Sequence, residues 1–217
     1  LAGRRALVTS GPTHELIDPV RYIANHSSGK QGHAVASALA FLGAKTTLIS
    51  GPVALEDPPG VKTVHVKSAV EMLRACELAL PVDIAVCAAA VADWGIAEKA
   101  DNKLKKSDED KQVITLKKNP DILATLAKRD DNKRPALVVG FAAETENVLE
   151  NAICKRIRKG CDWIMANDVS ESQGIFGGED NELHLVQAAS VENWARMSKE
   201  EAARNIANRV AAFFKAA

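Results

Sequence analysis

Short apolar and β-branched runs alternate along the chain with longer segments whose apolar residues recur at helical spacing. The runs with strand character cover residues 5–9, 46–50, 61–66, 84–88, 136–141, 163–166 and 183–186. The segments with helical periodicity cover residues 31–42, 69–80, 121–128, 147–159 and 199–215. Such alternation predicts an α/β fold, in which helices cover both faces of a mostly parallel sheet in a three-layer, Rossmann-like arrangement.

Two stretches break this pattern. Residues 98–111 contain five lysines, five acidic residues and almost no apolar side chain, so they cannot bury enough surface to pack. We therefore expect a flexible, lysine-rich flap at about residues 95–111. Residues 170–181 contain three glycines and no periodicity, which predicts a surface loop.

The size and charge of the chain narrow the possible functions. With 217 residues, of which 47% are apolar, it can form one domain spanning residues 1–217. The 28 basic residues balance the 28 acidic ones, so no overall field favours binding to nucleic acid. The longest apolar runs fall far short of the roughly 20 residues that span a bilayer, and no secretory signal is visible, so we expect a cytoplasmic protein without a membrane segment. The four cysteines lack the paired C-x-x-C spacing of metal sites, and we expect reduced thiols that serve packing.

A glycine-rich turn follows the first predicted strand. That strand leads into Gly11-Pro12-Thr13, and residues 27–32, Ser-Ser-Gly-Lys-Gln-Gly, open the next helix. Small residues at a helix N-terminus let an anion approach free backbone amides, and the helix dipole favours negative charge there. The pattern indicates a nucleotide or phosphate site. Glycines at such a turn also serve plain packing, so this signal alone leaves both interpretations open.

A nicotinamide-dependent reductase is the main functional alternative, because a strand, a glycine turn, a helix and a second strand form half of a dinucleotide-binding domain. The G-x-G-x-x-G fingerprint is absent, and the second strand ends at Ser50-Gly51 without the acidic residue that would bind a ribose hydroxyl. Tyr22, the single tyrosine, has His26 instead of lysine four residues later. A nucleotide-binding module without catalytic activity is the third interpretation.

A more specific signal comes from a series of short motifs. They are Gly11-Pro12-Thr13, Asp18-Pro19-Val20-Arg21, Asn25-His26-Ser27-Ser28-Gly29-Lys30, Ala88-Ala89-Ala90-Val91-Ala92-Asp93, Lys103-Leu104-Lys105-Lys106, Asn119-Pro120-Asp121-Ile122, Gly140-Phe141-Ala142-Ala143-Glu144-Thr145 and Ala166-Asn167-Asp168-Val169. In this order they resemble bacterial phosphopantothenoylcysteine synthetases from about residue 5 to residue 190. Trp94-Gly95-Ile96 and the mixed-charge run before Lys103 depart from that family's pattern.

The resemblance implies a ligase of coenzyme A biosynthesis. In that family a carboxylate of 4'-phosphopantothenate attacks the α-phosphate of CTP, pyrophosphate leaves, and the amine of L-cysteine then displaces CMP from the acyl-cytidylate. The first step builds negative charge on phosphates, which Mg²⁺ and lysines stabilise, and the second builds an oxyanion on the acyl group. The resemblance further implies a homodimer with the active site completed across the interface, and fusion in many bacteria to a flavin-dependent decarboxylase. Because the chain starts without Met and has no room for that second half, we expect an excised domain that binds no flavin.

The resemblance also assigns roles to single residues. The family's catalytic lysine falls on Lys103 in the flap, with Lys106 as support, its catalytic asparagine falls on Asn25, and Arg21 is the expected clamp for the anionic end of the substrate. Its contacts to CTP fall on Cys87, Ala88, Ala89, Asp93, Lys103, Lys106, Pro120, Asp121, Ile122, Leu123, Phe141, Lys155 and Lys159. Simpler interpretations are surface charges for the lysines, a turn former for Asn25, an ion pair for Arg21 and core packing for Phe141. Metal ligands and a preference for CTP over ATP do not follow from the residues themselves.

Overall fold

An eight-stranded sheet forms the centre of the computed structural model, which describes residues 1–105, 112–130, 132–169 and 180–216. The strands lie in the order β12-β11-β10-β9-β6-β1-β4-β5, and all neighbours from β10 to β5 are parallel. β11 and β12 pair antiparallel and extend one edge. The bounds are β1 Arg5–Ser10, β4 Lys45–Ser50, β5 Lys62–His65, β6 Ile84–Cys87, β9 Leu137–Glu144, β10 Trp163–Asp168, β11 Asp180–Val186 and β12 Val191–Ser198.

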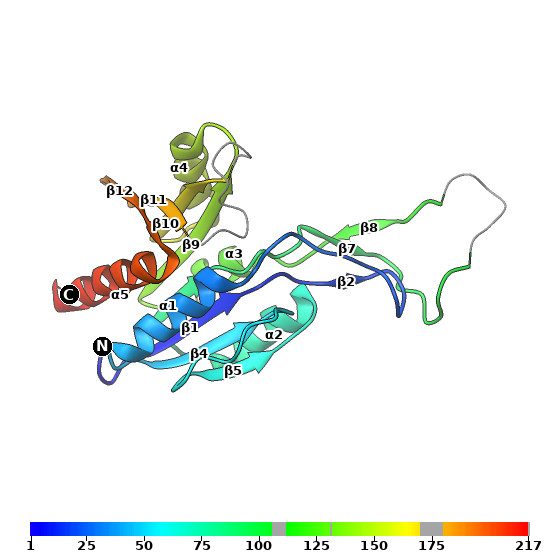
Figure 1. Ribbon diagram of the computed structural model, residues 1–217, viewed down its shortest axis with the longest axis horizontal. Helices are drawn as coiled ribbons and strands as arrows, with labels where there is room; N and C mark the ends of the chain where they lie inside the picture. Colours follow the sequence, from blue (N-terminus) through cyan, green and yellow to red (C-terminus); the bar gives the residue numbers. More distant parts are fainter. Residues whose placement is uncertain (106–111, 131, 170–179, 217) are drawn as a thin grey trace.

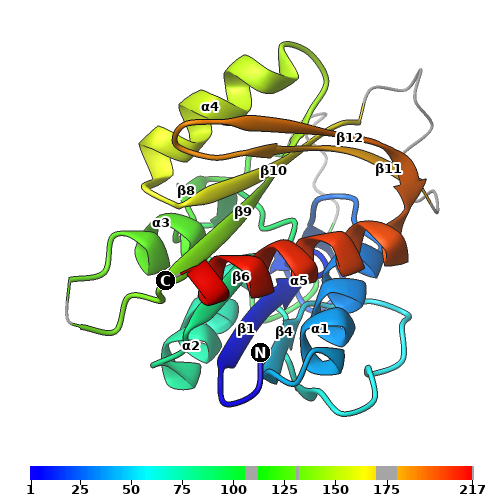
Figure 2. The same ribbon diagram turned by 90° about the vertical axis from the view of Figure 1, so that its left-hand side faces the viewer.

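Helices cover both faces of this sheet (Figure 2). On one face lie α1 (Lys30–Phe41) and α5 (Lys199–Ala216), and on the other lie α2 (Ala69–Ala79), α3 (Ile122–Ala127) and α4 (Val148–Lys159). The apolar core is accordingly split into two layers, one on each side of the sheet. The predicted three-layer α/β arrangement is confirmed.

The local sequence explains why these elements form. β1 is buried along its whole length after Arg5, as expected for a central parallel strand with helices on both sides. α2 begins after Ser68, whose side chain accepts a hydrogen bond from Glu71 N at 3.2 Å. α4 ends at Gly160, whose φ of 73° is a left-handed conformation that favours glycine. Leu39 of α1 is fully buried, and burying such a side chain stabilises a fold by about 1.5–3 kcal/mol.

A narrow arm projects from the body of the molecule (Figure 1). The amide of Ala100 donates to Ile17 O at 3.0 Å and joins the two halves of the arm. The described part of the predicted flap therefore belongs to a longer arm. Residues 95 and 96 at its start form part of a strand. Residues 106–111 of the predicted flap lie outside the described part of the chain. The arm contains two antiparallel ribbons, β2 (Glu15–Leu16) with β3 (Tyr22–Ile23), and β7 (Trp94–Ile96) with β8 (Leu116–Lys118).

The predicted elements of the sheet and its helices agree with the structure to within a few residues, and the differences lie at the antiparallel edge and in the arm. The apolar pattern does not predict β12, because this edge strand alternates between exposed and half-buried positions. β11 begins at Asp180, inside the loop predicted at residues 170–181, of which residues 170–179 are not described. The arm strands are two or three residues long and carry no periodicity. In the described ranges, no helix has both the length and the apolar character needed to cross a membrane.

Candidate active site

A cavity of about 510 Å³ opens at the carboxyl ends of three neighbouring parallel strands, β1, β6 and β9. Thr9, Cys87 and Phe141 line it from those strands. The start of α3 and one face of α4 form another part of its wall. Open α/β sheets bind their ligands at this edge, beyond the carboxyl ends of the strands.

Most residues that the resemblance assigns to CTP meet in this cavity. Ala88 belongs to the same strand end as its neighbours, but it does not line the cavity, and its amide donates to Thr9 O at 3.1 Å. Lys103 also lies outside the lining, and Lys106 is not among the described residues. The assigned residues that line the cavity are Cys87, Ala89, Asp93, Pro120, Asp121, Ile122, Leu123, Phe141, Lys155 and Lys159.

Other residues line the cavity without having been predicted. Trp94 and Lys118 face each other across β7 and β8, and the Lys118 ammonium lies 5.9 Å from the centre of the Trp94 ring. No local pattern marks these two, because only the pairing of the arm strands brings them to the cavity. Arg158 carries a signal that the sequence does contain, since it lies three residues from Lys155 on one helix. The unpredicted lining residues are Thr9, Val91, Ala92, Trp94, Lys118, Asn119 and Arg158.

The cavity carries more positive than negative charge. Its charged lining residues are the bases Lys118, Lys155, Arg158 and Lys159 and the acids Asp93 and Asp121. Lys159 is paired with Asp121, whereas no hydrogen bond or ion pair within the described ranges reaches the Lys155 ammonium. Burial lowers the pKa of Lys155, and the charge of Glu144 acts in the opposite direction. A partly buried cation without a close partner is well placed to bind an anion.

Asp121 holds two parts of the cavity wall in place. Its Oδ1 accepts a hydrogen bond from Ala124 N at 3.0 Å and thereby caps the start of α3. Burial acts to raise the pKa of this carboxyl, but the hydrogen bonds from Lys159 and from Ala124 N outweigh it, so the pKa lies below its ordinary value. Asp121 is therefore a fixed negative charge that joins α3 to α4.

All four cysteines are free thiols in the structure; Cys76 and Cys161 are buried, Cys87 is half-buried and Cys154 is exposed. Burial raises the pKa of Cys87 well above its ordinary value and that of Cys76 to about 12. The thiolate is the nucleophilic form of cysteine, and a raised pKa removes it at neutral pH. Cys87 thus contributes a small neutral surface to the cavity instead of a nucleophile.

Asn25 lies beside the cavity, on the loop that precedes α1. Its Nδ2 donates to Val91 O at 3.1 Å, and Val91 lines the cavity. A carboxamide carries two N–H donors, so this contact leaves one of them for a ligand. The position is compatible with the predicted role of Asn25.

The glycine-rich loop at the start of α1 is held by close packing. The carbonyl of Gly29, a residue with φ of 74°, accepts a hydrogen bond from Ser10 Oγ at 2.8 Å. A Cβ atom at Gly32 would lie 2.4 Å from that same Oγ. No residue from 25 to 32 is among those that line the cavity. These glycines therefore serve packing, and a phosphate site at this helix start stays a prediction.

Lys103 and Arg21 both lie on the arm, away from the cavity lining of their own chain. Lys103 is exposed. Arg21 Nε donates to Asp18 Oδ2 at 3.0 Å, and Arg21 Nη2 donates to Leu104 O at 3.0 Å. The guanidinium is thus engaged within the arm, as the ion-pair interpretation expects, and the substrate clamp stays a prediction.

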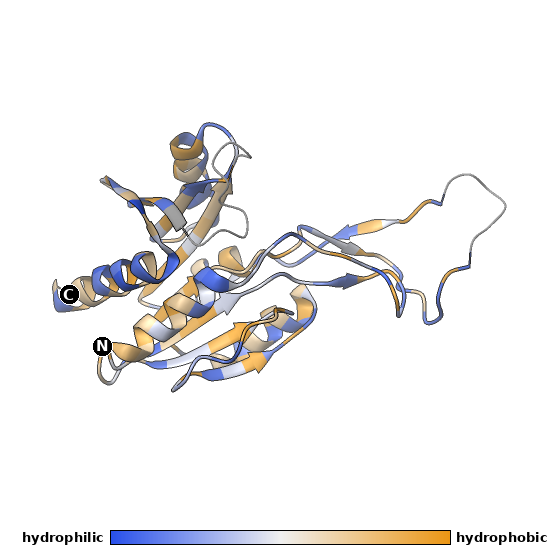
Figure 3. Ribbon diagram, viewed as in Figure 1, coloured by the Kyte–Doolittle hydropathy of each residue, from blue (hydrophilic) through white to orange (hydrophobic). Residues whose placement is uncertain are grey.

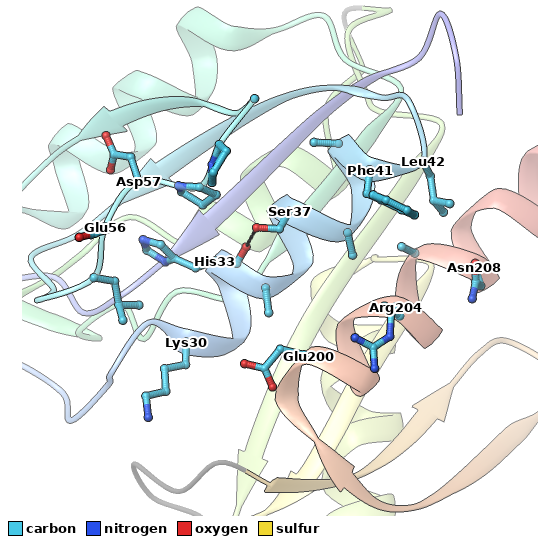
Figure 4. A pocket seen from close by; sticks show the side chains of 18 residues that line it. Lys30, His33, Ser37, Phe41, Leu42, Glu56, Asp57, Glu200, Arg204 and Asn208 are labelled. Carbon is cyan, nitrogen blue, oxygen red and sulfur yellow. Dashed lines mark hydrogen bonds between the residues drawn. The ribbon is translucent and has the colours of Figure 1, made fainter.

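A second and larger cavity, of about 1050 Å³, lies between α1, α5 and the segment that follows β4 (Figure 4). Its charged lining residues have both signs, with Lys30 and Arg204 against Glu56, Asp57 and Glu200. None of the predicted site residues lines it. We therefore regard the smaller cavity, with its excess of basic residues, as the candidate active site.

A family model and curated relatives both match this chain. A family model described as the DNA/pantothenate metabolism flavoprotein C-terminal domain matches residues 1–214. The coenzyme A biosynthesis bifunctional protein CoaBC of Escherichia coli K12 is 51% identical over 182 residues, which are 82% of this chain and 44% of that protein. The chain therefore spans about half the length of the curated relatives that it matches.

Solved structures share the fold along nearly the whole chain. A crystal structure of the C-terminal domain of CoaBC matches with a TM-score of 0.83 and 37% identity, covering 100% of this chain and 98% of that one. A Cab2 mutant in complex with phosphopantothenate-cysteine matches with a TM-score of 0.73, covering 98% of this chain and 89% of that one. At 14% identity, this second likeness shows the fold alone.

Proposed function

The chain belongs to the family of the DNA/pantothenate metabolism flavoprotein C-terminal domain, and from this premise we propose that it is a phosphopantothenate-cysteine ligase. It joins L-cysteine to 4'-phosphopantothenate with CTP as co-substrate, in coenzyme A biosynthesis. The observation that carries the proposal is the cavity at β1, β6 and β9, where most of the residues that match the family's CTP contacts converge near Lys155. The bifunctional name and greater length of the CoaBC relative support a full-length protein fused to a flavin-dependent decarboxylase.

The first half-reaction needs stabilisation of charge on phosphates. A carboxylate oxygen of 4'-phosphopantothenate forms a bond to the α-phosphorus of CTP, and the bond from that phosphorus to the bridging oxygen breaks. Pyrophosphate leaves with the electron pair. Lys155 and Arg158 on the cavity wall are positioned to stabilise this growing charge, and Lys103 adds a cation from the arm.

The second half-reaction needs stabilisation of an oxyanion on carbon. The amine nitrogen of cysteine attacks the acyl carbon, the carbon–oxygen bond to CMP breaks, and the nitrogen releases its proton to solvent. Asn25 lies beside Val91 of the cavity and donates through its free N–H to the tetrahedral oxyanion. A neutral amide suits this role because it carries no strong hydration shell that must be removed.

Mg²⁺ fits this cavity as an ion that the triphosphate itself mainly holds. Among the described residues, no cluster of three His, Cys, Asp or Glu side chains is arranged to hold a metal. Magnesium at nucleotide sites commonly binds one or two carboxylates together with phosphates and waters. We assign the carboxylate to Asp93, because Asp121 is already paired with Lys159. When bound, the ion would neutralise part of the phosphate charge.

We also propose a homodimer, which the surface of the arm supports. Apolar and polar positions are mixed along the ribbon of the arm (Figure 3), several of the apolar ones are exposed, and exposed apolar surface marks interaction sites. Lys103 stands on the same arm but not in the cavity of its own chain. We propose that a second copy covers the arm and that each cavity receives Lys103 from the partner chain. The exposed apolar residues of the arm are Val20, Tyr22, Trp94, Val113, Ile114 and Leu116.

Pyrophosphate release from CTP in the presence of 4'-phosphopantothenate, followed by CMP release on addition of cysteine, tests the proposed reaction. Lys103→Gln should suppress the first release, whereas Lys99→Gln, which removes another exposed lysine of the arm, should not. ATP in competition with CTP measures the nucleotide preference. Turnover of CTP that does not depend on 4'-phosphopantothenate would contradict the ligase. Binding of CTP without any turnover would favour a non-catalytic nucleotide-binding module.

Mixing two inactive variants tests the composite site. If the cavity of one chain works with Lys103 of the other, a heterodimer of Lys103→Gln and Lys155→Met chains contains one intact site. Activity should then appear on mixing, at a CTP concentration where neither variant alone is active. If both residues act within one chain, every site in the mixture carries a defect, and no activity returns.

A further inference from the structure

Asp18 is completely buried although it lies on the narrow arm. Its two carboxylate oxygens have separate partners. Oδ1 accepts hydrogen bonds from Val20 N at 2.8 Å and Arg21 N at 2.9 Å, and these bonds close the turn between β2 and β3. Oδ2 accepts from the guanidinium of Arg21 and, at 3.1 Å, from Leu104 N in the other half of the arm.

Both backbone polar groups of Leu104 are held. Its N–H donates to Asp18 Oδ2, and its carbonyl accepts from Arg21 Nη2 at 3.0 Å. Four residues earlier, Ala100 N donates to Ile17 O at 3.0 Å. Among the described residues, these three hydrogen bonds are the ones that join residues 100–105 to the other half of the arm, so the Asp18–Arg21 pair restrains the backbone of Leu104.

The carboxyl of Asp18 stays ionised under all ordinary conditions. The hydrogen bond from Arg21 holds its pKa well below the usual range, although burial acts in the opposite direction. An ionised acceptor strengthens a hydrogen bond relative to a neutral one, so the carboxylate holds Leu104 N more strongly than an amide oxygen would. The Arg21 side chain is 43% exposed, and partly exposed ion pairs add little net stability, so the main effect of this pair is where it holds the backbone.

We propose that Asp18 is a positioning residue for Lys103: by fixing the backbone of Leu104, it sets the place from which the neighbouring lysine reaches the triphosphate. This inference rests on the proposed ligase activity. A displacement of about 1 Å at a reacting group can cost on the order of 100-fold in rate.

Asp18→Asn separates the role of Oδ1 in closing the turn from the role of Oδ2 in holding Leu104 and Arg21. The amide oxygen can take the place of Oδ1, where two backbone N–H groups donate, and so keep the turn. The NH₂ group then stands in place of Oδ2 and cannot accept from Leu104 N or Arg21. We expect kcat for pyrophosphate release to fall roughly 10- to 100-fold, with the KM for CTP within about threefold of the parent, because the cavity lining is unchanged.

Asp162→Asn is the matched control. Asp162 Oδ2 accepts from Val138 N at 2.7 Å, and the carboxylate also binds Arg134 Nη2, so the variant loses the same kinds of partner. Asp162 stands directly before β10 and is not among the residues that line the cavity. The control should lose some stability and keep its kcat. Equal losses of kcat in the two variants would mean a general loss of structure and would overturn the inference.

A double variant shows whether Asp18 acts through Lys103. Once Lys103→Gln has removed the cation, its position no longer matters, so adding Asp18→Asn should leave the rate of pyrophosphate release unchanged. Residues that act independently instead multiply their effects on the rate. A double variant slower than Lys103→Gln by the full factor of Asp18→Asn would overturn the positioning role.

Limited proteolysis measures how firmly the segment around Leu104 is held, independently of the reaction. Trypsin cuts the bond between Lys103 and Leu104, which is the peptide that Asp18 holds. Cleavage there should be faster in Asp18→Asn than in the parent protein and in Asp162→Asn. If the parent protein released no pyrophosphate, the ligase proposal would fail while this measurement still decided whether Asp18 holds the segment. An unchanged cleavage rate would sink the inference, whatever the activity.

Discussion

Lys155→Met changes the charge of the candidate active site and little else. Methionine is similar in length and apolar, so it can occupy the same path along the cavity wall without the ammonium group. In the free protein this ammonium has no close partner within the described ranges, and burial disfavours its charge. Removing such a charge commonly leaves stability the same or raises it slightly. We therefore expect the free energy of unfolding to stay constant or rise by up to about 1 kcal/mol.

Binding of CTP should change in the opposite direction. Two unit charges about 4 Å apart attract each other by about 4 kcal/mol near a protein surface, which is an upper bound because both must be partly dehydrated. A hydrogen bond to a charged group contributes roughly 1.5–3 kcal/mol net. Since each 1.4 kcal/mol is about a factor of ten, the Kd for CTP should rise roughly 10- to 100-fold.

Titration calorimetry with CTP and urea unfolding measure the two effects on the same protein samples. Lys45→Met is the control, because Lys45 is an exposed lysine at the amino end of β4, whereas the cavity lies at the carboxyl ends of the strands. It should leave the Kd unchanged. A folded Lys155→Met protein that binds CTP within about threefold of the parent would show that this lysine does not hold the triphosphate, and the cavity would lose its main support as the CTP site.

Three further outcomes follow from the same geometry. Because the pKa of Lys155 is lowered, its ammonium loses the proton at a lower pH than an exposed lysine does, and kcat/KM for CTP should fall at that lower pH on the alkaline side. Lys155→Arg should move this fall to higher pH. Identical pH profiles for the two proteins would contradict the assignment. Asn25→Asp should release pyrophosphate with little CMP, because a carboxylate repels the second oxyanion; equal release of both products would refute this role. Gly140→Ala would place a Cβ atom 2.5 Å from Leu123 Cδ2 and 2.9 Å from Ile164 Cδ1. Urea unfolding should therefore show a loss of about 1–3 kcal/mol in the free energy of unfolding, and CTP binding should weaken. An unchanged unfolding midpoint would show that α3 can shift to make room for the added methyl group.

Much of the fold could be predicted from the chain because its determinants are local. The apolar run that became β1 and the helical spacing around Leu39 are properties of neighbouring residues, and they hold wherever the segment lies. The arm and the antiparallel edge could not be predicted in the same way. β7 and β8 are three residues each, and β12 is half-exposed, so their pairing depends on partners far away in the sequence.

The same division applies to the candidate site. Residues such as Asp93 and Lys155 were predicted because motifs and helix spacing mark them, although only a resemblance gave them a role. Trp94 and Lys118 were not, because they meet at the cavity through the pairing of arm strands.

The sequence by itself determined the class of fold, the order of its main elements and the residues that resemble a ligase, since each depends on composition and short-range spacing. Only the tertiary structure decided which of those residues share a cavity, that Lys103 stands outside it, and that Asp18 holds the peptide next to this lysine. The physical reason is that such contacts arise from the packing and pairing of distant segments, and no periodicity along the chain encodes which distant groups will touch.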